Sequence, residues 1–362
     1  MQSLARSARH VASRNPAGAT IFNLNASTQI SSSARWSSRS QVSPQRRAKF
    51  QALPAFFAWT VAGGIAFYSA QLLVAARQPC ANPNISDLAQ QTDVSTRYDD
   101  TADKFDSEVG FSEWLMGILK IRKELAQQCK GHVLEVSCGT GRNLGYFDVY
   151  TKGQVDSLTF VDLSAPMIDI CKKKWVALYA GKEALLKPGL VVRFLPATAL
   201  DRLPLAPTAE GPKKYDTIFQ TMGLCSTPDP GQLIANMVEH LDTSNPDARI
   251  ILLEHGRSYR QWLNNILDGS AQKHAELHGC WYNREIGALV SEAAERCGLV
   301  LVRERRYHLG TTWVVELKPA KVTKPAPPMA QTGDQQSQPK KTLYQRSKEF
   351  ISKPFSGIAL KL

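Results

Sequence analysis

Hydrophobic and polar positions along residues 93–318 alternate between two periods. Short apolar runs, typical of buried strands, alternate with longer amphipathic stretches, typical of helices. The pattern predicts strands at 132–136, 157–161, 191–195, 215–220, 249–253, 300–305 and 311–317, and helices at 95–129, from about 143, at 165–180, 230–241 and 283–297. Such alternation predicts an α/β domain with a mostly parallel sheet and helices on both faces. The last two strands have no helix between them, so we expect them to pair antiparallel at one edge.

One uncharged stretch, Gln51–Ala76, precedes this domain. As a helix rising about 1.5 Å per residue it would be roughly 39 Å long, enough to cross a hydrocarbon core of ~30 Å. It contains Gly63 and Gly64, a pair that is costly in an exposed soluble helix but common in membrane spans. We therefore predict a transmembrane helix over 51–76, with a buried core helix as the alternative.

The segment 1–50 has the composition of a mitochondrial transit peptide. Its arginines are scattered among Ser, Ala and Gln, and the first acidic residue of the chain is Asp87. A disordered basic arm is the alternative. Three basic residues, Arg46, Arg47 and Lys49, precede the predicted span, and only Arg77 follows it directly. The positive-inside rule therefore predicts a single-pass inner-membrane protein with its N-terminus in the matrix and its domain in the intermembrane space.

The formal net charge of +12 belongs to the two ends of the chain. Residues 87–318 contain 27 basic and 30 acidic residues, a net charge of −3. The basic balance is therefore no argument for a nucleic-acid partner, and none is predicted. We expect a linker at 77–92 and a disordered basic tail at 319–362, where Pro, Gln and Lys are frequent.

The candidate chemistry begins at His132–Asn143, HVLEVSCGTGRN, a predicted strand followed by a turn with two glycines. Ligands of open α/β sheets bind beyond the carboxyl ends of the strands, where glycine lets the backbone approach closely. Glu135 precedes Gly139 and Gly141, and Asp162 follows at the end of the next strand. An acid at that second position can accept hydrogen bonds from both hydroxyls of a ribose.

Two cofactor classes use this geometry. A dinucleotide site requires a third glycine where this chain has Leu144, and Glu135 would repel a pyrophosphate. S-adenosylmethionine has no phosphate, and it carries a sulfonium and an ammonium that a carboxylate attracts. The acid before the glycines therefore favours the methyl donor.

Five motifs in sequence order carry a resemblance to class I methyltransferases. EVSCGTGRN resembles their motif I, and VDLSAPM (Val161–Met167) is similar to their acidic loop. Tyr215–Pro230 and Arg249–Ser258 are similar to their fourth and fifth strands, and Arg97–Asp106 resembles the donor-covering helix of type 11, quinone-methylase-like members. The resemblance spans 97–317 and implies a Rossmann-like methyltransferase fold. It places S-adenosylmethionine at Glu135, Ser137, Gly139, Gly141, Asp162, Leu163, Thr198, Asp201 and Gln220.

A narrower resemblance concerns the tract Leu252–Gly287, which looks like that of fungal mitochondrial inner-membrane methyltransferase-like proteins. The chain departs from the wider family twice. Ser137 stands where motif I has its first glycine, and Thr198-Ala199-Leu200 replaces the usual Gly-Asp-Ala. The second departure leaves Asp201 as the substitute for the acid that contacts adenine.

Methyl transfer is an in-line displacement driven by proximity and alignment, and it needs a base only if the acceptor must lose a proton. Glu254 and His255 are the candidate catalytic pair, although Glu254 could equally pair with Arg257. No metal site is predicted. His274 and His278, one helical turn apart and close to Cys280, leave a metal as the alternative to a structural or substrate-pocket role.

These observations predict a methyltransferase that uses S-adenosylmethionine and is anchored in the mitochondrial inner membrane. Its acceptor would be a lipid-soluble small molecule or a membrane protein. The alternative is a non-catalytic assembly or regulatory factor of the same membrane that keeps the fold. Ser137 and the altered 198–201 segment support this alternative.

Overall fold

The computed structural model describes residues 44–320, and side chains from residue 56 onward. The predicted transit peptide, apart from 44–50, and the tail after residue 320 lie outside this range. Helix α1 (Pro44–Arg77) includes the predicted span. Its segment Phe56–Arg77, with a mean hydropathy of 1.4, is long and apolar enough to cross a membrane. The chain divides into two compact units within this helix, between Gly63 and Gly64, and the second unit holds the sheet.

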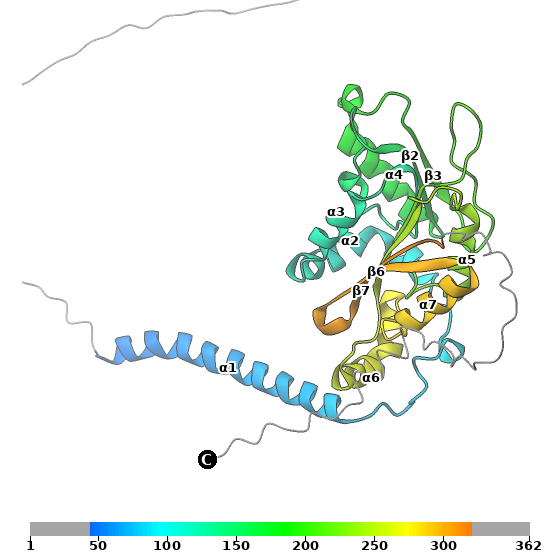
Figure 1. Cartoon of the computed structure of the whole chain (residues 1–362). Helices are drawn as coiled ribbons and strands as arrows, with labels where there is room; N and C mark the ends of the chain where they lie inside the picture. Colours follow the sequence, from blue (N-terminus) through cyan, green and yellow to red (C-terminus); the bar gives the residue numbers. More distant parts are fainter. Residues whose placement is uncertain (1–43, 321–362) are drawn as a thin grey trace, which may run out of the picture. The chain divides into compact units, whose positions relative to one another are not determined.

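The sheet has seven strands in the order β3-β2-β1-β4-β5-β7-β6. Figure 1 labels four of them, β2, β3, β6 and β7. The strands are β1 (Gly131–Val136), β2 (Val155–Asp162), β3 (Val191–Pro196), β4 (Thr217–Thr221), β5 (Arg249–His255), β6 (Leu299–Tyr307) and β7 (Thr312–Pro319). The pairs among β1 to β5 are parallel. The last two strands pair antiparallel, as predicted, and β7 lies between β5 and β6, so β6 forms the edge.

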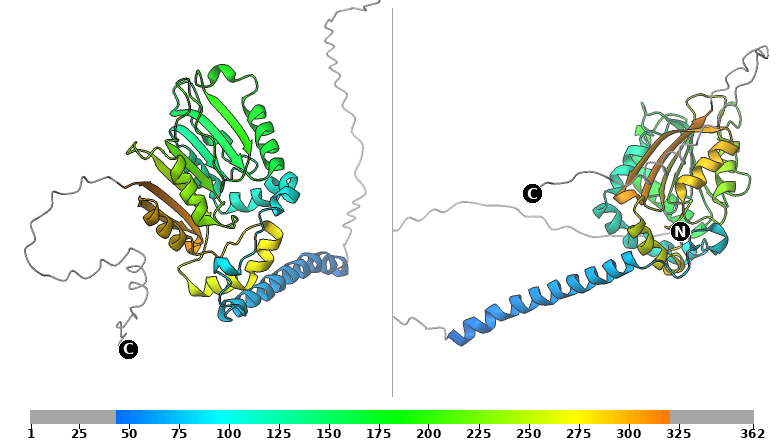
Figure 2. Two further views of the ribbon diagram at one scale, coloured as in Figure 1. Left: turned by 90° about the vertical axis from the view of Figure 1, so that its right-hand side faces the viewer. Right: turned by 60° about the horizontal axis from the view of Figure 1, so that its bottom comes forward.

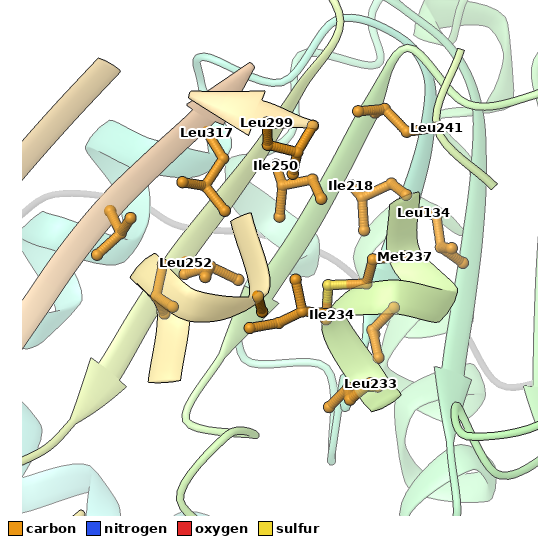
Figure 3. Packing of buried hydrophobic residues seen from close by; sticks show 14 of the residues in the cluster. Leu134, Ile218, Leu233, Ile234, Met237, Leu241, Ile250, Leu252, Leu299 and Leu317 are labelled. Carbon is orange, nitrogen blue, oxygen red and sulfur yellow. The ribbon is translucent and has the colours of Figure 1, made fainter. Parts of the chain in front are cut away.

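Alternating residues on the central strands point to opposite faces of this sheet. On one face Leu134, Ile218 and Ile250 pack against α5 (Pro230–His240) and α7 (Ile286–Arg296), as Figure 3 shows for α5 and the strands. On the other face Val133 and Phe219 pack against the helices α3 (Ile118–Ala126) and α4 (Ala165–Tyr179). A strand that is buried on both faces explains the continuous apolar runs in the sequence.

The remaining helices are α2 (Arg97–Leu115), α3 (Ile118–Ala126), α4 (Ala165–Tyr179) and α6 (Gln261–His278), and Figure 2 shows two further views of their arrangement. Two of the sheet-covering helices begin at side-chain caps. The Ser164 hydroxyl accepts from the backbone N–H of Met167 at the start of α4, and Asp229 accepts from that of Gln232 at the start of α5. These caps fix where the chain leaves the carboxyl ends of β2 and β4.

Two predicted elements differ from the structure, and one helix was not predicted. The helix expected over 95–129 is two helices, because Gly117 adopts a left-handed conformation with φ 69°. The helix expected from about residue 143 is wrong: only a short 3-10 turn, Leu144–Tyr146, forms. Phe147 then takes an extended conformation and packs its buried ring against Phe160 and Phe219, so core packing overrides the helical pattern. Helix α6 was not predicted.

Candidate functional site

A cavity of about 250 Å³ lies at the carboxyl ends of β1, β2, β3 and β4. The strand order reverses between β1 and β4, and open α/β sheets bind their ligands at such a reversal. The lining comes from the loops after these strands and from α2, and it includes Ser137–Thr140, Asp162–Ser164, Thr198–Leu200, Thr221–Gly223, Ser226–Pro228, Tyr98 and Phe105.

The turn after β1 uses three left-handed residues, Ser137 (φ 54°), Gly139 (φ 55°) and Gly141 (φ 77°). A Cβ at Gly141 would lie 2.6 Å from a methyl carbon of Leu144, so the turn also needs glycine there for space. A left-handed conformation costs an L-residue about 1–2 kcal/mol, so Ser137 is strained where the resembling family has glycine. Its hydroxyl accepts a hydrogen bond of 3.3 Å from the amide of Gln220.

Asp162 holds this turn from the end of β2. One carboxylate oxygen accepts from the backbone N–H of Gly139 at 2.8 Å, and the other accepts from that of Ser164 at 3.0 Å. Burial raises the pKa of Asp162, and these two N–H donors counteract it. The carboxylate and the neighbouring Leu163 line the cavity, so each oxygen keeps a free lone pair for a ligand.

Glu135 and Gln220 lie behind the turn, fully buried, and like Gly141 they do not belong to the lining of the cavity. Glu135 Oε1 accepts from the amide of Asn143 at 2.7 Å. Glu135 Oε2 and Gln220 Oε1 are the two buried side-chain oxygen or nitrogen atoms without a partner in the described part of the chain. Burial raises the pKa of Glu135 to about 8. Because a buried polar atom without a partner is costly, these two oxygens mark a place that a hydrogen-bond donor of a ligand can fill.

The segment after β3 contributes Thr198, Ala199 and Leu200 to the cavity, but not Asp201. The backbone carbonyl of Asp201 instead accepts from the buried Asn236 of α5. Asp201 is therefore a poor substitute for an acid that contacts the adenine. Thr198 is the predicted residue of this segment that the structure brings to the site.

Glu254 and His255, the predicted catalytic pair, lie at the end of β5 and do not line the cavity. Glu254 is fully buried, and its two oxygens accept from the backbone N–H groups of Gly223 and Leu224 at 3.1 and 3.0 Å. Burial raises the pKa of Glu254 well above its usual range. These contacts favour a positioning role for Glu254, which fixes the loop after β4, over that of a base.

A buried ion network that the sequence did not indicate ties α2 to the cavity. The carboxylate of Glu113, on α2, accepts two hydrogen bonds from Arg122 of α3, at 2.8 and 3.1 Å. It accepts two more from Arg142 of the turn after β1, also at 2.8 and 3.1 Å. Arg122 also donates to Thr221, and both residues line the cavity. Burial would raise the pKa of Glu113, but the two guanidinium groups outweigh it and the pKa is lowered.

A second acid extends the network. Asp106 of α2 accepts from Thr140 at 2.7 Å and from Arg142 at 3.1 Å, and it also pairs with Lys174 of α4. The pKa of Asp106 is lowered: burial opposes the shift, and Lys174 is the main partner that causes it. The helix is thus held over the turn by charges from α3, α4 and the turn itself.

The alternative metal site at His274 and His278 does not form with Cys280, which groups with Cys225 and His255 among the described residues. The His274 ring packs against those of His278 and Tyr282 in tilted arrangements, with centroids 4.7 and 4.1 Å away. Burial lowers the pKa of His274 to about 4. Cys280 contacts Cys225 and His255 instead.

Comparison with known families and curated proteins gives two findings. The sequence profile of a family described as "Methyltransferase domain" matches residues 111–301. The protein described as "Methyltransferase OMS1, mitochondrial" of Saccharomyces cerevisiae is 36% identical over 227 residues, which make up 62% of this chain and 46% of the yeast protein. The chain therefore spans about half the length of this yeast relative.

Two solved structures illustrate the more distant likenesses. Magnesium protoporphyrin IX methyltransferase from Synechocystis is 13% identical, with a TM-score of 0.40, over 64% of this chain and 99% of that one. A methyltransferase from Leishmania major is 13% identical, with a TM-score of 0.42, over 62% of this chain and 81% of that one. At these TM-scores the two structures have no weight for the function.

The ion network predicts that Glu113→Gln destabilises the protein. The substitution leaves two buried guanidinium groups without their carboxylate, and breaking such a pair costs about 3–5 kcal/mol. Glu124→Gln removes an exposed carboxylate of α3 and should cost less than about 1 kcal/mol. Thermal unfolding of the two variants, followed by circular dichroism, checks the difference, and equal midpoints would contradict the role of the network.

Proposed function

The chain belongs to the methyltransferase-domain family, with S-adenosylmethionine as its cofactor, and from this premise we propose that it methylates a lipid-soluble or membrane-bound acceptor at the mitochondrial inner membrane. Membership confirms the predicted family and cofactor. The observation that carries the proposal for the site is the cavity at the strand-order reversal, where the turn after β1 meets Asp162.

The residues around this cavity fit the chemistry of the donor. S-adenosylmethionine supplies, when bound, an electrophilic methyl group on a positively charged sulfur. Glu135 Oε2, which has no partner, would pair with a cationic group, and Gln220 Oε1 would accept from an N–H or O–H donor. The free lone pairs of Asp162 suit ribose hydroxyls, and Thr198 and Leu200 supply the wall that would face the adenine.

Helix α2 shapes the rest of the cavity. Tyr98 and Phe105 line it, and the phenol of Tyr98 bonds to the hydroxyl of Ser226, at 2.8 Å, on the loop after β4. With the helix held by Glu113 and Asp106, this arrangement would exclude water and orient the acceptor for in-line transfer. Helix α2, which we call the cover, and the loop after β4 are therefore the parts that would select the acceptor.

Two features support a membrane-associated acceptor. The first is the apolar helix segment Phe56–Arg77, and the second is an exposed apolar cluster beside the cavity cover. That cluster combines the end of α2 with the turn before β7, where His308 bonds to the backbone carbonyl of Met116, and it consists of Phe111, Trp114, Leu115, Met116 and Leu309. Exposed apolar surface of this kind marks contact with lipid or with another apolar partner. The mitochondrial yeast relative supports the compartment.

Titration calorimetry of the full chain in detergent with S-adenosylmethionine tests the donor site. We expect saturable binding that Asp162→Ala weakens about 10- to 100-fold, the value of hydrogen bonds to a charged group. Asp169→Ala, at an exposed position of α4, should bind as the wild type does. Binding that is unchanged in Asp162→Ala would exclude the assignment of this turn.

The same preparation distinguishes catalysis from binding alone. Incubation with labelled donor and mitochondrial membranes should place a labelled methyl group on a lipid-soluble molecule or on a membrane protein. Donor binding without any labelled product would favour the non-catalytic assembly factor.

Donor binding should also release a proton near neutral pH. The pKa of Glu135 is about 8, so the group is mostly protonated at pH 7, and pairing with a cation requires its ionised form. Affinity should therefore rise as the pH increases from 7 towards 8 and level off above it. Calorimetry in buffers of different ionisation enthalpy measures the released proton. Glu135→Gln should bind without releasing it, and equal release by that variant would contradict the pairing.

The proposed topology places the domain in the intermembrane space. Protease added to mitoplasts, whose outer membrane is ruptured, should degrade the domain, whereas protease added to intact mitochondria should not. Full protection in mitoplasts would place the domain in the matrix and contradict the positive-inside argument.

A further inference from the structure

Two cysteines and one histidine from three separate segments meet at the loop after β4, outside the lining of the cavity. Cys225 belongs to this loop, His255 ends β5, and Cys280 follows α6. The sulfurs of Cys225 and Cys280 are 3.1 Å apart, and Nδ1 of His255 is 3.8 Å from the sulfur of Cys280. The three ligand atoms all lie within 4.8 Å of one another, the one such group among the described residues that could hold a metal ion. We call these residues the Cys–His cluster.

The distances are close to those of a tetrahedral zinc site. Ligand bonds of about 2.3 Å to sulfur and 2.0–2.1 Å to nitrogen place two sulfurs about 3.8 Å apart, and a sulfur and a nitrogen about 3.5 Å apart. The separations of Cys280 from Cys225 and from His255 differ from these by less than 1 Å, within the reach of small side-chain rotations. Two thiolates and one imidazole are also the donor set that zinc prefers over magnesium or calcium.

The surroundings of the cluster hold the ligands in place. The backbone carbonyl of Cys225 accepts from the N–H of Trp281 at 2.8 Å, which joins the loop after β4 to the turn after α6. Arg284 donates to the carbonyls of Leu224 and Thr227 in the same loop. Both cysteines are buried and His255 is partly exposed, so an ion can enter from the histidine side.

The electrostatics agree with this geometry. A hydrogen bond from the Cys280 thiol, together with His255, lowers the pKa of Cys225 well below its usual range, while that of Cys280 is raised. A divalent cation bound here would displace the protons of both thiols. The resulting site, two thiolates with a neutral imidazole and a divalent ion, has no net charge to bury.

We propose that Cys225, His255 and Cys280 bind one zinc ion, with the fourth position taken by water or by a ligand. A disulfide between the two sulfurs would require an oxidant, and it would give His255 no role in the cluster. The site goes beyond the proposed function and does not depend on it. It would fasten the loop that contributes Ser226–Pro228 to the cavity onto β5 and the turn after α6.

Metal analysis of the full chain tests this site. The protein, purified in detergent without chelators, should contain about one zinc ion per chain by mass spectrometry of the metals. Cys225→Ser and Cys280→Ser should each lose it. Cys129→Ser is the matched control, because Cys129 is equally buried but contacts the backbone of α3, and it should keep the ion.

Cobalt substitution needs no variant and so does not depend on whether the variants fold. Metal-free wild type titrated with Co²⁺ should develop a thiolate-to-cobalt charge-transfer band that saturates at one equivalent and that zinc abolishes. Absence of zinc and of this band would overturn the proposal. In that case alkylation and mass spectrometry would show whether the two cysteines are free thiols or a disulfide.

Discussion

The covered cavity depends on one buried carboxylate that two guanidinium groups share. Glu113 lies on α2, Arg122 on α3 and Arg142 in the turn after β1, so a single charge fixes three segments relative to one another. It also decides the electrostatics of the cavity. Two uncompensated guanidinium charges here would repel a cationic methyl donor, and the carboxylate of Glu113 offsets one of them. Holding the cover in place and admitting a cation are thus two results of the same interaction.

The turn after β1 shows how a sequence departure is tolerated. Ser137 takes the left-handed conformation that the family's glycine would adopt without cost, and the structure compensates from two sides. Gln220 donates to its hydroxyl, and Gly223 leaves the space, since a Cβ there would lie 2.0 Å from the Gln220 amide nitrogen. The departure therefore lies in the turn after β1 and its compensation at the end of β4 and in the loop after it, and the strained turn keeps the shape that the site requires.

Much of the fold follows from the sequence because the central strands are buried on both faces and read as continuous apolar runs. Helix α6 escaped prediction because its apolar positions are interrupted by polar residues and by Gly269. The helix predicted from about residue 143 is the opposite error, a helix that does not form. Only the packing of the core shows that Phe147 must leave the helical conformation to bury its ring. The motif residues of the donor turn were predictable because they are adjacent in sequence. Glu113 and the Cys–His cluster were not, because their partners are separated in sequence and each residue alone resembles an ordinary helix or core position.

Three carboxylates next to the cavity, the fully buried Glu135 and Glu254 and the partly buried Asp162, have raised pKa values, and they differ in what satisfies them. Glu254 is satisfied by two backbone N–H groups of the loop after β4, and Asp162 by two N–H groups of the loops after β1 and β2. Glu135 receives only the Asn143 amide, and one of its oxygens has no partner. The protein thus uses two carboxylates to build its own loops and leaves the third incomplete. An incomplete buried acid is stable as a neutral carboxyl group without ligand and as a carboxylate beside a cation, so it favours a positively charged ligand over a neutral or anionic one.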